Sequence, residues 1–191
     1  MEDKRLRLDV GCGGRGTIWD GFIGIDIWPP PKEPRRPAEQ YMQLDFVKGE
    51  LPWGPGTVNE IVALHVIEHM LRDDGLILMK RARELLKPGC YMTVACPDLK
   101  KLCVAYIHEN DRFWDHRYKR NNREVWPGDT LADKLNWAIH QEGHRWAYDL
   151  DSLRCLAVQA GWGNVQPIPF NSPYHTRKDH ETGIVCMRGA A

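Results

Sequence analysis

The hydrophobic positions of this chain follow two patterns, short runs typical of strands and longer runs with a helical period. Near the N-terminus, Leu6, Leu8 and Val10 alternate with polar residues, which is typical of a strand. Residues 60–66 form an almost unbroken apolar run, as expected for a central parallel strand covered on both faces. Comparable runs predict further strands at residues 22–27, 41–46, 91–96, 165–170 and 183–187. The hydrophobic pattern therefore predicts seven strands.

Helical patterns separate several of these strands. The clearest follows residues 60–66: its apolar residues share one face, Asp73 or Asp74 is expected to cap its start, and Pro88 with Gly89 is expected to stop it. Asp98 is expected to cap a second helix. The alternation of strands and helices predicts an α/β fold.

Two more helices are expected in the second half of the chain. One is predicted at residues 131–141, where Thr130 and Asp133 have the spacing of a capping box. The last is predicted to begin near residues 151–152 and to end at Gly161, since glycine is favoured directly after a helix. The hydrophobic pattern, together with the residues that start and stop helices, thus assigns most of the chain to helices and strands.

The first expected strand leads into a glycine-rich loop. Gly11, Gly13, Gly14 and Gly16 lie within six positions, and such a junction at the carboxyl edge of a parallel sheet is where α/β proteins bind nucleotide-like ligands. The spacing also matches the dinucleotide pattern. However, the acidic residue of the next expected strand, Asp26, follows Gly16 by only ten positions, which leaves no room for the long helix of a dinucleotide site.

The same stretch resembles the first motif of class I S-adenosylmethionine-dependent methyltransferases, acid-x-Gly-x-Gly, with Asp9, Gly11 and Gly13 in the matching places. More closely, the chain is similar to small methyltransferase type 11 relatives, in which a very short link joins the first two strands. The resemblance covers most of the chain and continues, in order, through Asp26, Leu44-Asp45-Phe46, His65-Val66-Ile67-Glu68-His69, Leu86-Lys87-Pro88-Gly89 and residues 143–149. It implies a Rossmann-like, seven-stranded, mostly parallel sheet with helices on both faces, a short first crossover and a final antiparallel hairpin.

The resemblance also implies S-adenosyl-L-methionine as the cofactor. Asp26 would accept hydrogen bonds from both ribose hydroxyls, and Ile27 with Trp28 would pack on the adenine. Asp45 would accept from the adenine amine while Phe46 packs on the ring. A helix-cap or turn aspartate is the alternative for both acids. The expected cofactor-binding residues are Asp9, Gly11, Cys12, Gly13, Asp26, Ile27, Asp45, Phe46 and His65.

Three histidines are the catalytic candidates. His65 ends the fourth expected strand, beside the position that the resemblance implies for the donor methyl group. His144 is predicted to be the general base, because a histidine with a pKa near about 6.5 can take a proton from a hydroxyl acceptor at neutral pH. A histidine that only joins two helices by a hydrogen bond is the alternative. His140 is the third candidate.

Metal binding is a further interpretation of the same histidines. On a helical turn, Glu68 and His69 follow His65 by three and four residues, and His140 with His144 repeats the second spacing. The chain lacks the His-Glu-x-x-His order of zinc proteases, and no cysteine accompanies the group. The sequence therefore predicts no metal ion.

Composition narrows the function classes. Of 191 residues, 26 are basic and 26 acidic, which removes a whole-chain electrostatic argument for nucleic acid or an anionic membrane. The six cysteines contain no Cys-x-x-Cys pair, residues 1–5 lead directly into the first strand, and no apolar run approaches a membrane span. We therefore expect a cytoplasmic protein without a membrane partner; the sequence indicates no oligomeric state.

A single domain over residues 1–191 is expected, with residues 108–149 as an inserted lid or substrate segment. Within it, residues 112–126 interleave aromatic residues with five basic and two acidic ones. This segment would suit a phosphate-bearing acceptor or RNA, or it would be a salt-bridged surface.

The resemblance predicts a methyltransferase acting on a small-molecule or sugar-like acceptor, at oxygen. Two alternatives stay open: a nucleic-acid methyltransferase, which would be expected to carry an Asn/Asp-Pro-Pro-Tyr-like motif after the fourth strand, and a non-catalytic protein that binds S-adenosylmethionine. Methyl transfer depends largely on positioning, so no single base decides between these functions.

Overall fold

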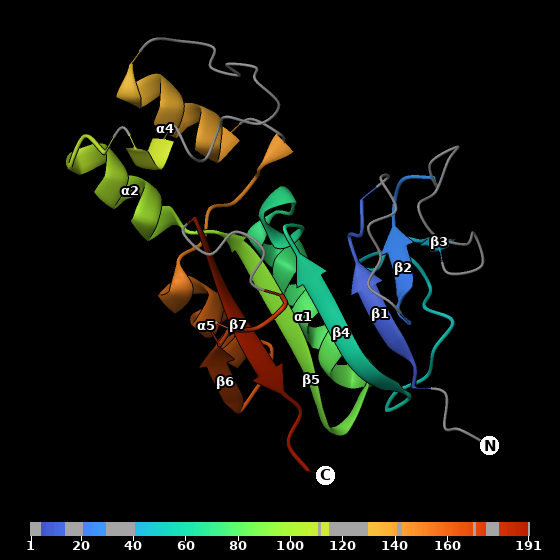
Figure 1. Ribbon diagram of the computed structural model, residues 1–191. Helices are drawn as coiled ribbons and strands as arrows, with labels where there is room; N and C mark the ends of the chain where they lie inside the picture. Colours follow the sequence, from blue (N-terminus) through green and yellow to red (C-terminus); the bar gives the residue numbers. More distant parts are fainter. Residues whose placement is uncertain are drawn as a thin grey trace.

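The computed structural model describes residues 5–13, 21–29, 41–110, 112–114, 130–140, 143–169, 171–174 and 180–190. These residues form a seven-stranded sheet with the order β3-β2-β1-β4-β5-β7-β6 (Figure 1). The strands are β1 (Arg7–Val10), β2 (Ile23–Asp26), β3 (Tyr41–Gln43), β4 (Val58–Leu64), β5 (Leu86–Pro97), β6 (Asn164–Pro167) and β7 (Glu181–Met187). Strands β1 to β5 run parallel, and β7 is antiparallel to both of its neighbours. The expected mostly parallel sheet with a final antiparallel hairpin is confirmed.

The helices form two groups. They are α1 (Arg72–Leu85), α2 (Leu99–Ile107), α4 (Leu131–His140) and α5 (Leu150–Gln159), together with a short 3-10 turn, η2 (Ile67–His69). Helices α1 and α5 pack against each other on one face of the sheet, whereas α2 and α4 pack together beyond the carboxyl end of β5 (Figure 1).

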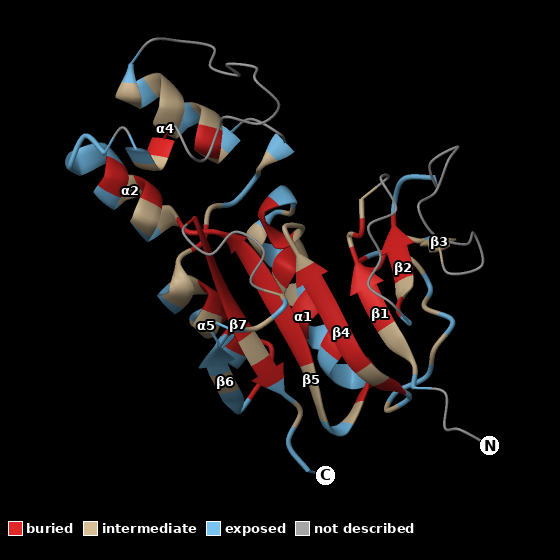
Figure 2. Cartoon of the chain, viewed as in Figure 1, coloured by how far each residue is buried: buried red, intermediate tan, exposed pale blue. Residues whose placement is uncertain are grey.

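Three hydrophobic clusters match this arrangement. The largest lies between the sheet and helices α1 and α5 and contains Leu8, Ile25, Ile61, Leu78, Met92 and Leu156 among others. On the opposite face, Val62 packs with Phe22 and Cys12, which come from the segments between β1 and β2. A separate small cluster joins α2 to α4 through Leu102 and Ala138. Figure 2 shows the buried strands at the centre of the molecule.

Two expected helix starts are confirmed by their hydrogen bonds. The Asp98 carboxylate accepts the backbone N–H groups of Lys100 (2.9 Å) and Lys101 (3.3 Å) at the start of α2. Before α4, the Thr130 hydroxyl donates to the Asp133 carboxylate at 2.7 Å and accepts the Asp133 N–H at 3.2 Å. These short polar side chains satisfy N–H groups that have no partner within the helix.

Two other expected starts were wrong by a few residues. Helix α1 begins after Leu71, which makes no side-chain cap, so Asp73 and Asp74 lie inside the first turn, where carboxylates interact favourably with the helix dipole. Helix α5 is capped by Asp149, whose carboxylate accepts the Ser152 N–H at 2.8 Å while the Ser152 hydroxyl accepts the Asp149 N–H at 2.9 Å. This capping box moves the start of the helix to Leu150.

Several strands also begin or end at other residues than the sequence predicts. Strand β3 ends at Gln43 instead of residue 46, because Asp45 Oδ1 accepts the N–H groups of Val47 (2.8 Å) and Lys48 (2.9 Å) and closes a turn. Strand β5 begins at Leu86, directly after α1, and runs through the residues expected only to stop the helix. Strand β6 ends at Pro167, before the expected end at residue 170.

Several expected features lie outside the described residues, namely Gly14, Gly16 and most of the basic and aromatic segment at residues 112–126. In the described part of the chain, no helix is both long and apolar enough to cross a bilayer.

Candidate functional site

The glycine loop leaves β1 in a tight turn against the end of β4. Gly11 and Gly13 both have φ near +71°, and the Gly11 N–H donates to the Ile25 carbonyl at 2.8 Å. A Cβ atom on Gly11 would clash with the side chain of Val66, which follows β4. The backbone of this loop is therefore in direct contact with the first residues after β4, which lie at the same edge of the sheet.

Asp26 holds the loop in place. Its Oδ2 accepts the Gly13 N–H at 2.8 Å, its Oδ1 accepts the Trp28 N–H at 3.1 Å, and the residue is buried. A carboxylate has about four acceptor positions, so both oxygens can still accept hydrogen bonds from a ligand. A Cβ atom on Gly13 would meet none of the described residues within 4 Å, so these residues leave the space beside this carboxylate open.

Buried polar groups surround the base of the loop. Asp9 is buried within β1, and Cys12 is buried beside it. Burial, and then the carboxylates of Asp9 and Asp26, raise the pKa of the Cys12 thiol to about 12. Burial and the charge of Asp26 also raise the pKa of Tyr41 above its usual value. Cys12 is therefore a neutral thiol at physiological pH, which excludes it as a thiolate nucleophile.

The residues after Asp26 expose apolar surface. Ile27 is 56% exposed and Trp28 is 65% exposed. Their backbone carbonyls are held by β3, since the Gln43 amide donates to Ile27 at 3.1 Å and the Tyr41 hydroxyl donates to Trp28 at 2.9 Å. This fixed apolar surface lies directly beside the Asp26 carboxylate and suits the face of a flat ring.

Phe46 occupies different surroundings from those that the sequence predicts, whereas Asp45 has one of the two roles kept open for it. One oxygen of Asp45 closes the turn after β3, which is the turn role kept open for this residue. Phe46 is only 3% exposed and packs in the main core. Its ring therefore offers almost no surface to a ligand, and the adenine contact expected for it is not supported by this packing.

His65 lies between two buried carboxylates. Its Nε2 is 2.9 Å from Glu181 Oε2, its Nδ1 is 3.3 Å from Glu68 Oε1, and its backbone is left-handed with φ +55°. The Glu181 carboxylate accepts a hydrogen bond, so this contact places the proton of a neutral imidazole on Nε2 and fixes the orientation of the ring. Both ring nitrogens face carboxylates, which favours a positioning role for His65 over that of a base.

Glu181 is a site residue that the sequence does not reveal. It begins β7, which pairs with the end of β5, and Lys101 Nζ donates to its carbonyl at 2.8 Å. Only the antiparallel insertion of β7 brings this residue to His65. An isolated acid at the start of a late strand carries no local signal for such a contact.

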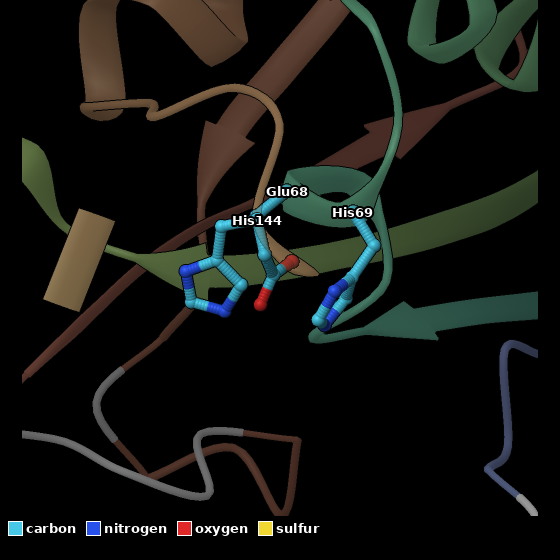
Figure 3. A group of neighbouring side chains, drawn as sticks. All are labelled: Glu68, His69 and His144. Carbon is cyan, nitrogen blue, oxygen red and sulfur yellow. The ribbon is translucent and has the colours of Figure 1, made fainter. Parts of the chain in front are cut away.

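Glu68, His69 and His144 form a group at the same edge (Figure 3). The side-chain ligand atoms of the three residues all lie within 4.8 Å of one another, and the two imidazole rings meet edge to face with centroids 4.8 Å apart. The Glu68 carbonyl accepts the N–H groups of Arg145 (2.7 Å) and Trp146 (3.1 Å), which joins the segment before α5 to η2. His140, at the exposed end of α4, is not part of this group.

No protein-family model matches the chain, and no curated protein matches it. Solved structures do. One is a chain of the complex between the Haloferax volcanii Trm112 methyltransferase activator and a methyltransferase, with a TM-score of 0.60, 13% identity, and coverage of 100% of this chain and 85% of that one. Human N-acetylserotonin methyltransferase in complex with S-adenosylmethionine has a TM-score of 0.58 and 18% identity. The Haemonchus contortus phosphoethanolamine N-methyltransferase 2, with phosphomonomethylethanolamine and S-adenosylhomocysteine, has a TM-score of 0.57 and 12% identity.

The alignments with the human and Haemonchus contortus proteins cover all of this chain but only 50% of each of those chains. At these identities the similarity establishes the fold. The protein has the Rossmann-like fold of S-adenosylmethionine-dependent methyltransferases.

Proposed function

We propose that this protein is an S-adenosylmethionine-dependent methyltransferase. The observation that carries the proposal is the hydrogen bond from the Gly13 N–H to Asp26, which fixes an open glycine loop at the carboxyl edge of the sheet. Similarity to several methyltransferase folds supports it. Bound S-adenosylmethionine supplies an electrophilic methyl group, and the chain has to hold it, exclude water and orient an acceptor.

The donor would be held by residues from β1, β2 and the turn after β3. Asp26 has acceptor positions for the ribose hydroxyls, and the exposed Ile27 and Trp28 can pack on the adenine. The backbone of Gly11 and Gly13 would lie against the methionine part, with Asp9 beneath it as the acceptor for the amino group, directly or through water. Asp45 Oδ2 is the oxygen left by the turn for the adenine amine.

The acceptor side would be the edge that His65, Glu68 and His144 share. Gly11 contacts Val66, which directly follows His65, so this edge adjoins the proposed donor loop. We propose a small-molecule or sugar-like acceptor that is methylated at oxygen, because histidine and carboxylate side chains gather here and can orient a hydroxyl group by hydrogen bonds.

Calorimetry tests the donor site. The purified protein should bind S-adenosylmethionine and S-adenosylhomocysteine, and bind NAD weakly or not at all. Asp26→Ala should weaken binding at least about tenfold, because each hydrogen bond to a charged acceptor contributes roughly 1.5–3 kcal/mol. Asp26→Asn keeps one acceptor oxygen, so its affinity for S-adenosylmethionine should lie between those of the wild type and Asp26→Ala. Asp151→Ala, an exposed acid on α5, is the matched control and should bind as the wild type does.

Preferential binding of NAD, or an unchanged dissociation constant in a folded Asp26→Ala variant, would contradict this donor site. Release of S-adenosylhomocysteine in the presence of sugars, sugar nucleotides, phenols or RNA then tests catalysis separately. A protein that binds the donor but turns over none of these acceptors would fit the non-catalytic alternative.

A further inference from the structure

The group of Glu68, His69 and His144 combines ligands from two distant parts of the chain. Glu68 and His69 belong to η2, whereas His144 precedes α5. Figure 3 shows the Glu68 carboxylate grouped with the two imidazole rings at this edge. One carboxylate and two imidazoles form a donor set that zinc proteins use with water at the remaining coordination position.

Glu68 supplies independent evidence that this place takes a cation. The residue is only 2% exposed, and its Oε2 accepts no hydrogen bond from the described residues. Its Oε1 faces His65, so the side chain is anchored on one oxygen while the other is buried without a donor. A buried carboxylate oxygen without a partner is costly, and a bound cation beside it would remove that cost.

His144 is held in the tautomer that a metal ligand needs. Its Nδ1 is 3.1 Å from the Ala138 carbonyl, which can only accept, so Nδ1 carries the proton in the neutral ring. The lone pair is then on Nε2. A histidine ligand that donates its second ring N–H to a backbone carbonyl is the usual outer-shell arrangement at protein metal sites.

From this geometry we propose that Glu68, His69 and His144 bind one divalent transition-metal ion of the zinc class. Imidazole and carboxylate together favour zinc, cobalt, nickel or iron over magnesium or calcium, which prefer oxygen ligands alone. Ligand atoms around tetrahedral zinc lie about 3.3 Å apart, so the widest separation has to contract by about 1.5 Å. His69 is exposed, and a rotation of its side chain supplies this movement.

The metal site does not depend on methyltransferase activity, but it changes the role of His144. A nitrogen that binds a metal ion cannot also take a substrate proton. The three side chains leave a coordination position for water or for an oxygen of a small molecule at the edge beside the glycine loop. This assignment replaces the general base predicted from the sequence with a ligand.

Metal titration of the full-length protein tests the site. After treatment with a chelator, the protein should bind one equivalent of zinc in competition with a chromogenic chelator. Cobalt should give the visible absorption of a tetrahedral site. His69→Ala should lower zinc affinity at least about 100-fold, since loss of an outer-shell partner alone costs about 10–100-fold. His108→Ala, an exposed histidine at the end of α2, is the control and should bind zinc normally.

His69 is exposed, so its loss should leave folding intact, which circular dichroism can verify. His144→Ala should abolish the cobalt spectrum as well. Zinc should raise the melting temperature of the wild type and of His108→Ala, but not that of His69→Ala. The absence of stoichiometric binding, or unchanged affinity in His69→Ala, would overturn the proposal. S-adenosylmethionine binding is measured in the same variants, so the result can contradict the proposed metal site without contradicting the proposed donor site, or the reverse.

Discussion

Two glycines of the same loop share a backbone conformation but have different surroundings. Gly11 and Gly13 both have φ near +71°, yet a Cβ atom would clash with Val66 at the first and meet no residue of the described part of the chain within 4 Å at the second. Left-handed backbone alone costs an alanine about 1–2 kcal/mol, and overpacking adds about 1–3 kcal/mol. Gly11→Ala should therefore lower the free energy of unfolding in urea clearly more than Gly13→Ala does.

Removing the clashing side chain provides the control. In a Val66→Gly background, which also removes the Cβ atom that would lie 2.5 Å from a Cβ on Gly11, Gly11→Ala should cost about as much as Gly13→Ala, because only the backbone penalty remains. Equal losses for the two single variants would show that the loop moves away from Val66 without cost.

At the residue scale, the sequence predicts the position of the glycine loop better than the surroundings of the residues near it. The positions of Asp26 and the glycines follow from strand ends, which a local pattern reveals. The burial of Phe46 does not, because a ring after a strand can turn toward the core or toward solvent, and only the packing of the whole sheet decides which. Glu181 reaches His65 through strand pairing that no local pattern encodes.

At the element scale, the start of α5 depends on one side chain. Asp149 accepts the Ser152 N–H, and this hydrogen bond lowers the pKa of its carboxyl below the ordinary 3.8. Asp149→Ala should cost about 0.5–2 kcal/mol at pH 7. Because the folded-state pKa is lowered, this contribution is complete above about pH 4 and is lost as the pH falls through the folded-state value.

The stability difference between the wild type and Asp149→Ala should therefore shrink between pH 7 and pH 3 in urea titrations. Asp151→Ala, in the first turn of the same helix, should cost only a few tenths of a kcal/mol, since Asp151 makes no cap and acts through the helix dipole and an exposed ion pair with Arg154 at 4.0 Å. A difference that grows on acidification would contradict the capping assignment.

Helix and strand identities followed from periodicity, whereas several ends did not. The apolar stripes predicted α1, α2, α4 and α5, because each must bury one face. The ends were decided by single hydrogen bonds that compete with neighbouring candidates, as with Asp149 against residues 151–152 and the Asp45 turn against a longer β3. Two acids close together in sequence carry equal capping signals until tertiary packing selects one.

At the scale of the whole molecule, the separate small cluster between α2 and α4 should open more easily than the main core. Leu102→Ala should speed hydrogen exchange in α2 and α4 while leaving β4 and β5 protected. Leu78→Ala, in the main core, should instead lower the free energy of unfolding by about 2–5 kcal/mol and speed exchange throughout the sheet. Equal effects of the two variants on β4 would show one cooperative unit.

The hydrogen bonds from Arg145 and Trp146 to the Glu68 carbonyl join two segments that are far apart in the sequence, so this part of the site can form only late in synthesis. During synthesis, β1, β2 and β4 emerge before residue 70, so the glycine loop and its Asp26 contact can form early. The group around Glu68 has to wait until His144 has emerged, and the second contact of His65 waits for β7. Contacts between such distant segments form late and slowly. A partly synthesised chain can thus contain the complete glycine loop with its Asp26 contact before the group of Glu68, His69 and His144 has formed. Ligand binding at the glycine loop is therefore no measure of whether the histidine group has formed.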